Sequence, residues 1–314
     1  MDQQQELIKA IEDIGDLIGN THLEKFSNND TGNGCQIYAK LEWQQLGGSV
    51  KARPAYNIIK QALMAGELTP NKILIDASSG NTGIAYAAIG RKIGIKVEIC
   101  LPSNASRERI DILKKLNATI RFTSPFGGTD EAQLIAKKTY ESRPGLYFYA
   151  DQYANNHNWE AHYATTAEEI FDETKGKITH FVAGLGTTGT MMGTGRRLKE
   201  LNPSIKLIGL QPEAALHGLE GWKHLDTAIV PKIYNPSLLD EVITIYTEEA
   251  YDLIRDINVS KQLLLSPSSA ANLVGAQKVA ANNAHRVVVT VFPDDVSKYG
   301  DVLKQIFETR TYAA

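Results

Sequence analysis

A lysine between a glycine turn and a predicted helix start is the first candidate for covalent chemistry in this sequence. Gly47 and Gly48 let the backbone turn tightly before Lys51, and Pro54 is tolerated in the first turn of a helix that Ser49 can cap. At the positive end of a helix the charged form of Lys51 is disfavoured. A lysine with a lowered pKa is a nucleophile for carbonyl groups, although most single lysines are solvated surface residues.

A loop of glycines and threonines at residues 184–190 is a second candidate, because it joins a predicted strand to a predicted helix. Its backbone N–H groups and hydroxyls form an anion cradle, which the helix dipole strengthens. The loop also matches G-x-G-x-x-G, and Glu213 lies beyond the next strand, where a dinucleotide-binding fold uses an acid. A phosphate site, a dinucleotide site and a structural turn all remain open at this point.

A third candidate is the stretch of residues 78–82, at the start of another predicted helix. Ser78, Ser79, Asn81 and Thr82 offer hydroxyl and amide groups beside the backbone N–H groups, a combination that suits a carboxylate. Ordinary N-capping explains Ser79 or Asn81 equally well.

The elements around these loops alternate between strands and helices. We expect strands over residues 35–42, 73–75, 97–101, 119–123, 146–150, 178–183, 205–210, 242–246, 263–265 and 287–292. We expect helices over residues 7–18, 55–65, 84–93, 107–116, 131–142, 160–174, 191–201, 248–257 and 270–281. The alternation predicts an α/β protein with parallel sheets, and the length allows two domains with a ligand cleft between them.

Composition excludes several classes of function. The 314 residues carry a net charge of -3, which gives no reason to expect a nucleic-acid or membrane partner. Two cysteines suit a reducing compartment, and the first residues lack the features of a signal peptide, so we expect a cytoplasmic protein. His157 and His162 are five residues apart, without a pattern of Cys or Glu partners, so we predict no metal site.

Five motifs, in order along nearly the whole chain, resemble the cysteine synthase (O-acetylserine sulfhydrylase) family, which belongs to the tryptophan-synthase-β-type pyridoxal-phosphate enzymes. They are I-G-N-T at residues 18–21, G-S-V-K-A-R at 48–53, S-G-N-T-G at 79–83, G-T-T-G-T at 186–190 and S-S-A-A at 268–271. The fourth motif is similar to the phosphate loop of the B isoform. These motifs argue against a dinucleotide site, because the lysine turn has no role in such a site.

The resemblance implies pyridoxal-phosphate fold type II. In this fold two domains, each with a mostly parallel twisted sheet flanked by helices, hold the active site in the cleft between them. We expect a larger cofactor-binding domain formed by residues 1–46 and 152–314, and a smaller mobile domain formed by residues 47–151.

The resemblance also implies roles for individual residues. Lys51 would hold pyridoxal 5'-phosphate as a Schiff base and act as the catalytic base, Asn81 would contact the ring hydroxyl, and Ser268 would face the ring nitrogen. The phosphate would be bound by Gly186, Thr187, Thr188, Gly189 and Thr190. The substrate carboxylate would be bound by Ser78, Ser79, Thr82 and Gln152.

Three departures from the family pattern concern the site. Ala52 replaces the usual aspartate after the lysine, and Ala270 replaces a glycine, which is expected to restrict the backbone near Ser268. Lys223 and His224 stand roughly where the B isoform carries arginines, which leaves the use of a larger thiol donor open.

The resemblance implies a homodimeric enzyme for β-replacement, which makes L-cysteine from O-acetylserine, or a similarly activated serine, and sulfide through an aminoacrylate. Other β-replacement enzymes, such as cystathionine β-synthase or diaminopropionate synthase, remain alternatives. The altered motif around Lys51 also leaves open a catalytically weak regulatory protein that binds pyridoxal phosphate. A nicotinamide oxidoreductase is a more distant alternative.

Overall fold

The chain is divided by its own contacts into two compact units, and each is described here by itself. The computed structural model describes residues 2–26, 34–282 and 284–308. The first unit comprises residues 1–19, 45–161 and 231–233, and the second unit comprises residues 20–44, 162–230 and 234–314. Residues 47–151, expected as the smaller domain, all lie in the first unit, which also includes residues 1–19, 45–46, 152–161 and 231–233. Residues 1–19 belong to this unit because their helix packs on the helices that follow the lysine turn.

The first unit contains a four-stranded parallel sheet in the order β5-β4-β3-β6. Its strands are β3 (Ile73–Ala77), β4 (Lys96–Pro102), β5 (Thr119–Thr123) and β6 (Tyr147–Tyr149). Its helices are α1 (Gln3–Asp13), a 3-10 turn (Gly15–Leu17), α2 (Ala52–Met64), α3 (Asn81–Ile93), α4 (Arg107–Lys115) and α5 (Gly128–Ser142). Helix α6 (Asn156–Ala164) begins in this unit, and the division between the units falls inside it.

Helices cover both faces of this sheet. The connections through α3 and α4 step along the sheet in one direction, and the connection through α5 returns in the other. Because parallel crossovers are right-handed, the two sets of helices lie on opposite faces. One hydrophobic core therefore joins the sheet to α1, α2 and α3, and a smaller one joins it to α5.

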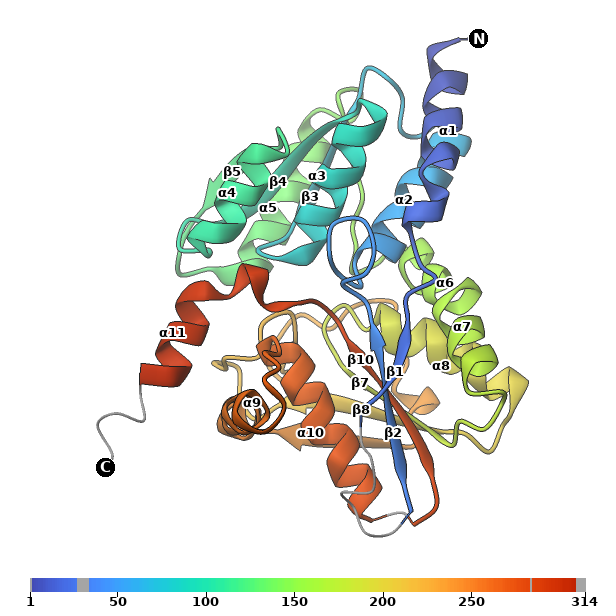
Figure 1. Ribbon diagram of the computed structural model, residues 1–314. Helices are drawn as coiled ribbons and strands as arrows, with labels where there is room; N and C mark the ends of the chain where they lie inside the picture. The colour runs from blue at the N-terminus through green and yellow to red at the C-terminus, as the bar shows by residue number, and fades with distance from the viewer. Residues whose placement is uncertain (1, 27–33, 283, 309–314) are drawn as a thin grey trace. The chain divides into compact units, whose positions relative to one another are not determined.

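The second unit contains a six-stranded sheet in the order β1-β2-β10-β7-β8-β9, in which only the β1–β2 pair is antiparallel (Figure 1). Its strands are β1 (Leu23–Lys25), β2 (Gln36–Leu41), β7 (His180–Gly184), β8 (Lys206–Pro212), β9 (Glu241–Ile245) and β10 (Val287–Phe292). Its helices are α7 (Thr166–Glu173), α8 (Gly189–Leu201), α9 (Thr247–Lys261), α10 (Pro267–Ala281), α11 (Gly300–Glu308) and the 3-10 turns Pro236–Leu238 and Val296–Lys298.

Helix α10 packs on β10, β7 and β2 with α9 outside it, while α8 packs on β7 and β8 with α7 outside it. The right-handed crossovers again place these two layers on opposite faces of the sheet. Central strand β10 is rich in β-branched residues, which suits a strand that is covered on both faces. Both units thus have the predicted α/β architecture of mostly parallel sheets flanked by helices.

A buried lysine fastens the start of the second unit. The side chain of Lys40 in β2 is fully buried, and its Nζ lies 2.9 Å from Glu169 Oε2 and 2.6 Å from Glu173 Oε2. The other oxygens of these carboxylates accept hydrogen bonds from the backbone N–H groups of Asn20 and Leu23. The segment that leads into β1 is therefore tied to α7 by a cluster that compensates a buried charge.

Some predicted elements differ from those observed. The predicted helix over residues 160–174 is divided into α6 and α7 at Thr165, whose φ of -126° and ψ of -68° are not helical. Residues 263–265, predicted as a strand, form an irregular connection between α9 and α10, and the three-residue strand β1 was not predicted. Short elements carry too few residues for their periodicity to be read.

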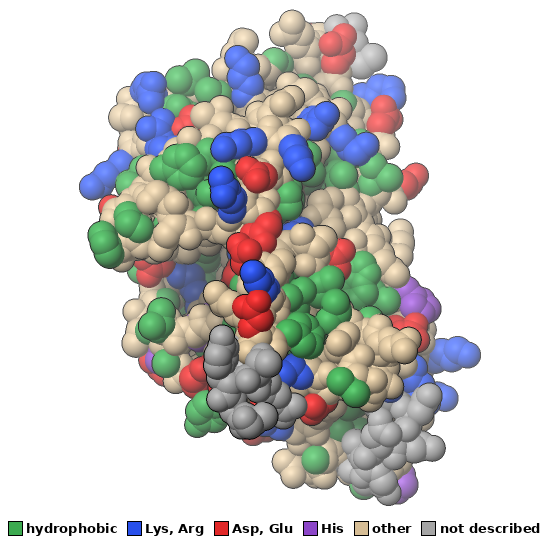
Figure 2. Space-filling model, turned by 60° about the vertical axis from the view of Figure 1, so that its left-hand side comes forward, with side chains coloured by type: hydrophobic (Ala, Val, Ile, Leu, Met, Phe, Trp, Pro, Cys, Tyr) green, Lys and Arg blue, Asp and Glu red, His purple; other side chains and the backbone are tan. Residues whose placement is uncertain are grey.

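The surface mixes charges of both signs. On the face seen in Figure 2, basic and acidic side chains are interspersed, as expected for a net charge of -3. Within the described residues, no helix has the length and apolar character that crossing a membrane requires.

A buried carboxyl group lies near the carboxyl end of β3. Asp76 is fully buried; its Oδ1 accepts a hydrogen bond from the N–H of Ala77 (2.8 Å) and its Oδ2 accepts one from the N–H of Gln152 (3.2 Å). Loss of hydration raises the pKa of Asp76 to about 7, with the charge of Asp151 acting in the same direction. In the folded protein Asp76 therefore keeps its proton to a higher pH than in the unfolded chain.

This pKa predicts that Asp76 lowers stability as pH rises. Between about pH 4 and pH 7 the folded protein holds a proton that the unfolded chain releases. The contribution of Asp76 to the free energy of unfolding is therefore fully present below about pH 4 and is lost as the pH rises through about 7. We expect Asp76→Asn to reduce the fall in the free energy of unfolding between pH 5 and pH 8, a comparison accessible by urea denaturation.

Asp111→Asn, at an exposed carboxylate on α4, is the matched control and should leave that fall unchanged. Equal pH dependence in the wild type and Asp76→Asn would contradict the assignment.

Candidate functional site

The lysine turn forms as predicted, and helix α2 begins at Ala52, three residues before the predicted start at residue 55. Gly47 and Gly48 have φ values of 80° and 62°, which favour glycine, and Lys51 is the residue immediately before α2. The hydroxyl of Ser49 accepts a hydrogen bond from the N–H of Lys51 (3.3 Å), so Ser49 shapes the turn and does not cap the helix. Lys51 is half-buried at the positive end of α2.

The turn also lies against α3. A Cβ atom at Gly47 would come within 3.4 Å of the Cα of Ala85, one turn into that helix. The start of α3 carries the loop of residues 78–82, so the lysine turn and this loop pack on the same helix.

Ser78 organises the loop of residues 78–82. Its hydroxyl oxygen accepts hydrogen bonds from the N–H groups of Gly80 (3.2 Å) and Gly83 (3.0 Å). Ser79 and Asn81 are half-buried beside it, while Ser78 itself is buried. The structure therefore gives Ser78 a role in folding the loop, and leaves Ser79 and Asn81 more open to a ligand.

Two predicted substrate residues, 70 positions apart in the sequence, are in direct contact. The hydroxyl of Thr82 donates to Oε1 of Gln152 at 2.6 Å, and Nε2 of Gln152 donates to the carbonyl oxygen of Ala77 at 2.8 Å. Asn158 Nδ2 donates to the Gln152 carbonyl oxygen, and all of these polar side chains are buried. Gln152 is thus held across the carboxyl end of β3, beside the start of α3.

The cradle of residues 186–190 lies between β7 and the start of α8. The whole stretch is buried, and Thr188 adopts a φ of 68°, which turns the backbone sharply before the helix. The hydroxyl oxygen of Thr188 has no hydrogen-bond partner among the described residues, although it is buried. A phosphate bound at this helix start would supply the missing acceptor, so the residues present fit the phosphate group of pyridoxal phosphate.

Close backbone approach fixes the shape of this cradle. A Cβ atom at Gly184 would overlap the indole of Trp222, and a Cβ atom at Gly186 would overlap the carbonyl oxygen of Gly221. The N–H of Lys223 donates to the carbonyl oxygen of Leu185 at 2.8 Å. The segment around residue 222 therefore lies directly on the cradle.

One residue at the cradle was not predicted. His162 is fully buried, with Nε2 lying 3.3 Å from the hydroxyl oxygen of Thr190 and Nδ1 lying 2.9 Å from that of Thr166. Its spacing from His157 carried no signal for this contact, which is made between separate helices.

Ser268 lies at the start of α10, in a cluster of buried polar groups. Ser266 caps the helix by accepting a hydrogen bond from the N–H of Ser269, and the Ser268 hydroxyl donates to Oδ1 of Asp294 at 3.3 Å. Asp294 was not predicted; the only signal was an acid just beyond buried strand β10. Ala270 lies within the helical turn, so its replacement of a glycine imposes no strain.

The predicted site residues form two groups. Lys51, Asn81, Thr82 and the other predicted carboxylate-binding residues belong to the first unit, whereas residues 186–190 and Ser268 belong to the second.

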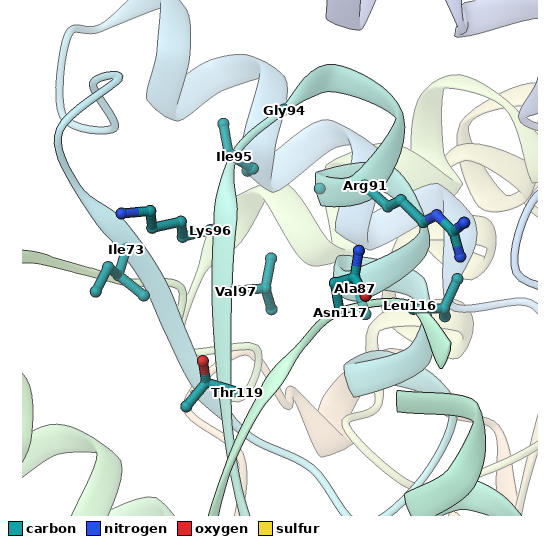
Figure 3. A pocket seen from close by; sticks show the side chains of 11 residues that line it. Ile73, Ala87, Arg91, Gly94, Ile95, Lys96, Val97, Leu116, Asn117 and Thr119 are labelled. Carbon is teal, nitrogen blue, oxygen red and sulfur yellow. The ribbon is translucent and has the colours of Figure 1, made fainter. Parts of the chain in front are cut away.

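A cavity of about 290 Å³ lies at the amino ends of β3, β4 and β5, the sheet edge opposite the loop of residues 78–82 (Figure 3). It contains none of the predicted site residues. The charged ends of Arg91 and Lys96 point away from each other in Figure 3, so we assign no ligand to it.

Comparisons with known proteins agree with the motifs. The family described as "Pyridoxal-phosphate dependent enzyme" matches residues 14–294. Cysteine synthase of Aquifex aeolicus is 45% identical over 93% of this chain and 91% of its own length. O-acetylserine dependent cystathionine beta-synthase of Bacillus subtilis is 36% identical over 95% of this chain and 98% of its own.

The solved structure of cysteine synthase (OASS) from Entamoeba histolytica matches with a TM-score of 0.85 and 31% identity, covering 96% of this chain and 94% of that one. The family match covers most of the chain, and the motifs at residues 48–53, 79–83 and 186–190 lie within it. The chain therefore belongs to the pyridoxal-phosphate dependent enzymes, and within them to the cysteine synthase family.

Proposed function

We propose that this protein is a cysteine synthase, which makes L-cysteine from O-acetylserine, or a similarly activated serine, and sulfide. The observation that carries the proposal is the buried cradle at the start of α8, where the Thr188 hydroxyl finds no partner among the described residues. Such a cradle suits the phosphate of the cofactor. The names of the relatives supply the reaction.

In this reaction Lys51 carries the cofactor and then acts as a base. Pyridoxal phosphate, when bound, supplies the electron sink that allows the α-proton and the β-substituent of the substrate to leave. After the substrate amine releases it, Lys51 Nζ takes the α-proton, and it returns a proton to the same carbon after sulfide has added. Asn81 and Ser268 orient the ring, and residues 186–190 bind the phosphate.

Binding of the substrate carboxylate falls to the start of α3. Ser79 and Thr82 offer hydroxyl donors there, Gln152 offers its amide, and the helix N-terminus favours a negative charge. Ser78 contributes by folding the loop through its two backbone hydrogen bonds.

A second candidate is cystathionine formation, which the Bacillus subtilis relative favours by its name. Both reactions share O-acetylserine and differ in the thiol that adds. Product analysis with sulfide and with homocysteine, each in excess, separates the two.

We further propose that the protein is a cytoplasmic homodimer without a nucleic-acid partner. The family resemblance supports the dimer. The two cysteines suit a reducing compartment, and the small net charge argues against binding of nucleic acid.

The sulfur donor depends on the charge beside the cradle. Lys223 and His224 follow Trp222, and the N–H of Lys223 holds them to the loop through Leu185. His224 Nε2 lies 3.8 Å from a carboxylate oxygen of Asp226. A dianionic donor such as thiosulfate is best held by a fixed guanidinium, which neither residue supplies, whereas sulfide needs no such anchor.

Lys51→Ala should bind pyridoxal phosphate without a covalent link, because the only amine proposed to carry the cofactor is gone. Borohydride reduction followed by mass spectrometry of the peptides measures the link. Lys60→Ala, in helix α2 that follows Lys51, is the control and should be labelled at Lys51 like the wild type. Cofactor fixed to the Lys51→Ala chain would identify another lysine.

Thr82→Val should weaken O-acetylserine binding about ten- to a hundredfold, the usual effect of losing one hydrogen bond to a charged group. The visible spectrum of the resting enzyme should stay the same, because Thr82 is not assigned to the cofactor. Titration of that spectrum with O-acetylserine gives the affinity, and Thr82→Ser, which keeps the hydroxyl, should retain most of it. If Thr82→Val binds O-acetylserine as tightly as the wild type does, Thr82 does not bind the substrate.

Steady-state assays should give a higher kcat/KM with sulfide than with thiosulfate, and Lys223→Arg should raise the value for thiosulfate. Lys206→Arg, at the first residue of β8, is the matched control and should leave kcat/KM unchanged with both donors. A wild-type preference for thiosulfate would place the anchoring charge on other residues.

A further inference from the structure

A buried histidine connects the cradle to a neighbouring helix through two hydroxyl groups. His162 lies in α6 and is fully buried, and its two ring nitrogens face Thr166 at the start of α7 and Thr190 at the start of α8. The distances are 2.9 Å from Nδ1 to the Thr166 oxygen and 3.3 Å from Nε2 to the Thr190 oxygen. Thr166, His162 and Thr190, which we call the hydroxyl–histidine chain, thus form a continuous line of hydrogen-bonding groups.

The hydrogen bonds along this chain can all be donated in one direction or all in the other. A neutral imidazole has one N–H and one acceptor nitrogen, and a hydroxyl donates once while it also accepts. If Nε2 carries the proton, Thr166 donates to Nδ1 and Nε2–H donates to Thr190, whose own proton is directed onward. If Nδ1 carries the proton, Thr190 must donate to Nε2, and its proton is no longer available to a ligand.

An anion at the cradle selects between these directions. A phosphate dianion only accepts hydrogen bonds, so a threonine hydroxyl that binds it must donate to it. Thr190 can do so while it remains bonded to His162 only in the first arrangement, in which Nε2–H donates to Thr190. Because His162 is fully buried, a hydrogen bond lost there is costly.

We infer that His162 is a positioning residue for the phosphate group of the cofactor: it holds the Thr190 hydroxyl with its proton directed to the anion. The inference rests on the proposed phosphate site at residues 186–190 and adds to it a residue outside the loop. His162 makes no contact with the reacting atoms in this scheme. It orients a donor before the anion arrives, which lowers the cost of ordering on binding.

The alternative is that His162 only fills space between α6, α7 and α8. The two roles differ in what they do to a ligand that lacks the phosphate. A packing role affects pyridoxal 5'-phosphate and pyridoxal alike, since both need the same folded site. A positioning role acts on the phosphate alone.

The experiment measures dissociation constants of both ligands with the cofactor-free protein. His162→Phe should weaken binding of pyridoxal 5'-phosphate about fivefold, the effect of one ordinary hydrogen bond, and leave pyridoxal unchanged. His162→Gln, which restores an amide donor, should recover part of the loss. Thr166→Val removes the donor to Nδ1 without touching the cradle and should lower phosphate affinity in the same sense.

A double-mutant cycle tests the path. Because His162 acts through the hydroxyl of Thr190, His162→Phe combined with Thr190→Val should bind pyridoxal 5'-phosphate no more weakly than Thr190→Val alone. Additive losses, or equal losses for pyridoxal, would overturn the inference while leaving the phosphate site in place. A wild type that does not prefer pyridoxal 5'-phosphate to pyridoxal would overturn the proposed phosphate site together with the inference.

The tautomer of His162 provides a readout that is independent of any change in packing. Long-range nitrogen-15 NMR of protein labelled at histidine should find the proton on Nε2 when pyridoxal 5'-phosphate is bound, with the His162 signals assigned by their absence from His162→Gln. An unprotonated Nε2 in the loaded protein would overturn the inference directly.

Discussion

In both units a parallel strand runs almost directly into a helix, and this constraint determines where ligands can bind. In the first unit β3 ends at Ala77 and α3 begins at Asn81, and in the second β7 ends at Gly184 and α8 begins at Gly189. The first N–H groups of each helix have no partner inside the helix, and its dipole favours a negative charge there. The substrate carboxylate and the cofactor phosphate are both anions, so each is assigned to one of these ends.

The two helix starts are shaped by different means. At α8 the backbone of the cradle passes so close to Gly221 and Trp222 that Gly184 and Gly186 cannot carry a side chain without a shift of the neighbouring segment. At α3 a side chain shapes the loop, since the Ser78 hydroxyl oxygen accepts hydrogen bonds from two backbone N–H groups next to it. A cradle set by backbone contact tolerates little adjustment, whereas a loop set by one hydroxyl can exchange that partner.

The sequence predicts features that depend on local pattern and misses those that depend on distant contact. The alternation of apolar strands and helices predicted the two mostly parallel sheets. The loops of residues 78–82 and 184–190 were placed correctly at helix starts, because glycine, serine and threonine are typical of such turns. The break at Thr165 was missed, since no glycine or proline marks it. The contact between His162 and Thr190 and the burial of Asp76 arise from packing between elements far apart in the chain, and no spacing in the sequence indicates them.

Substrate binding at the start of α3 has to be an exchange of hydrogen bonds. Thr82 already donates to Gln152 at 2.6 Å, and Nε2 of Gln152 already donates to Ala77, so a carboxylate bound there as proposed must take over a donor that has a neutral partner. The exchange favours binding of the carboxylate, because a hydrogen bond to a charged oxygen is roughly twice as strong as one between neutral groups. The contact between Thr82 and Gln152 therefore satisfies both side chains in the absence of substrate, and its strength sets how much of the new bond appears as affinity.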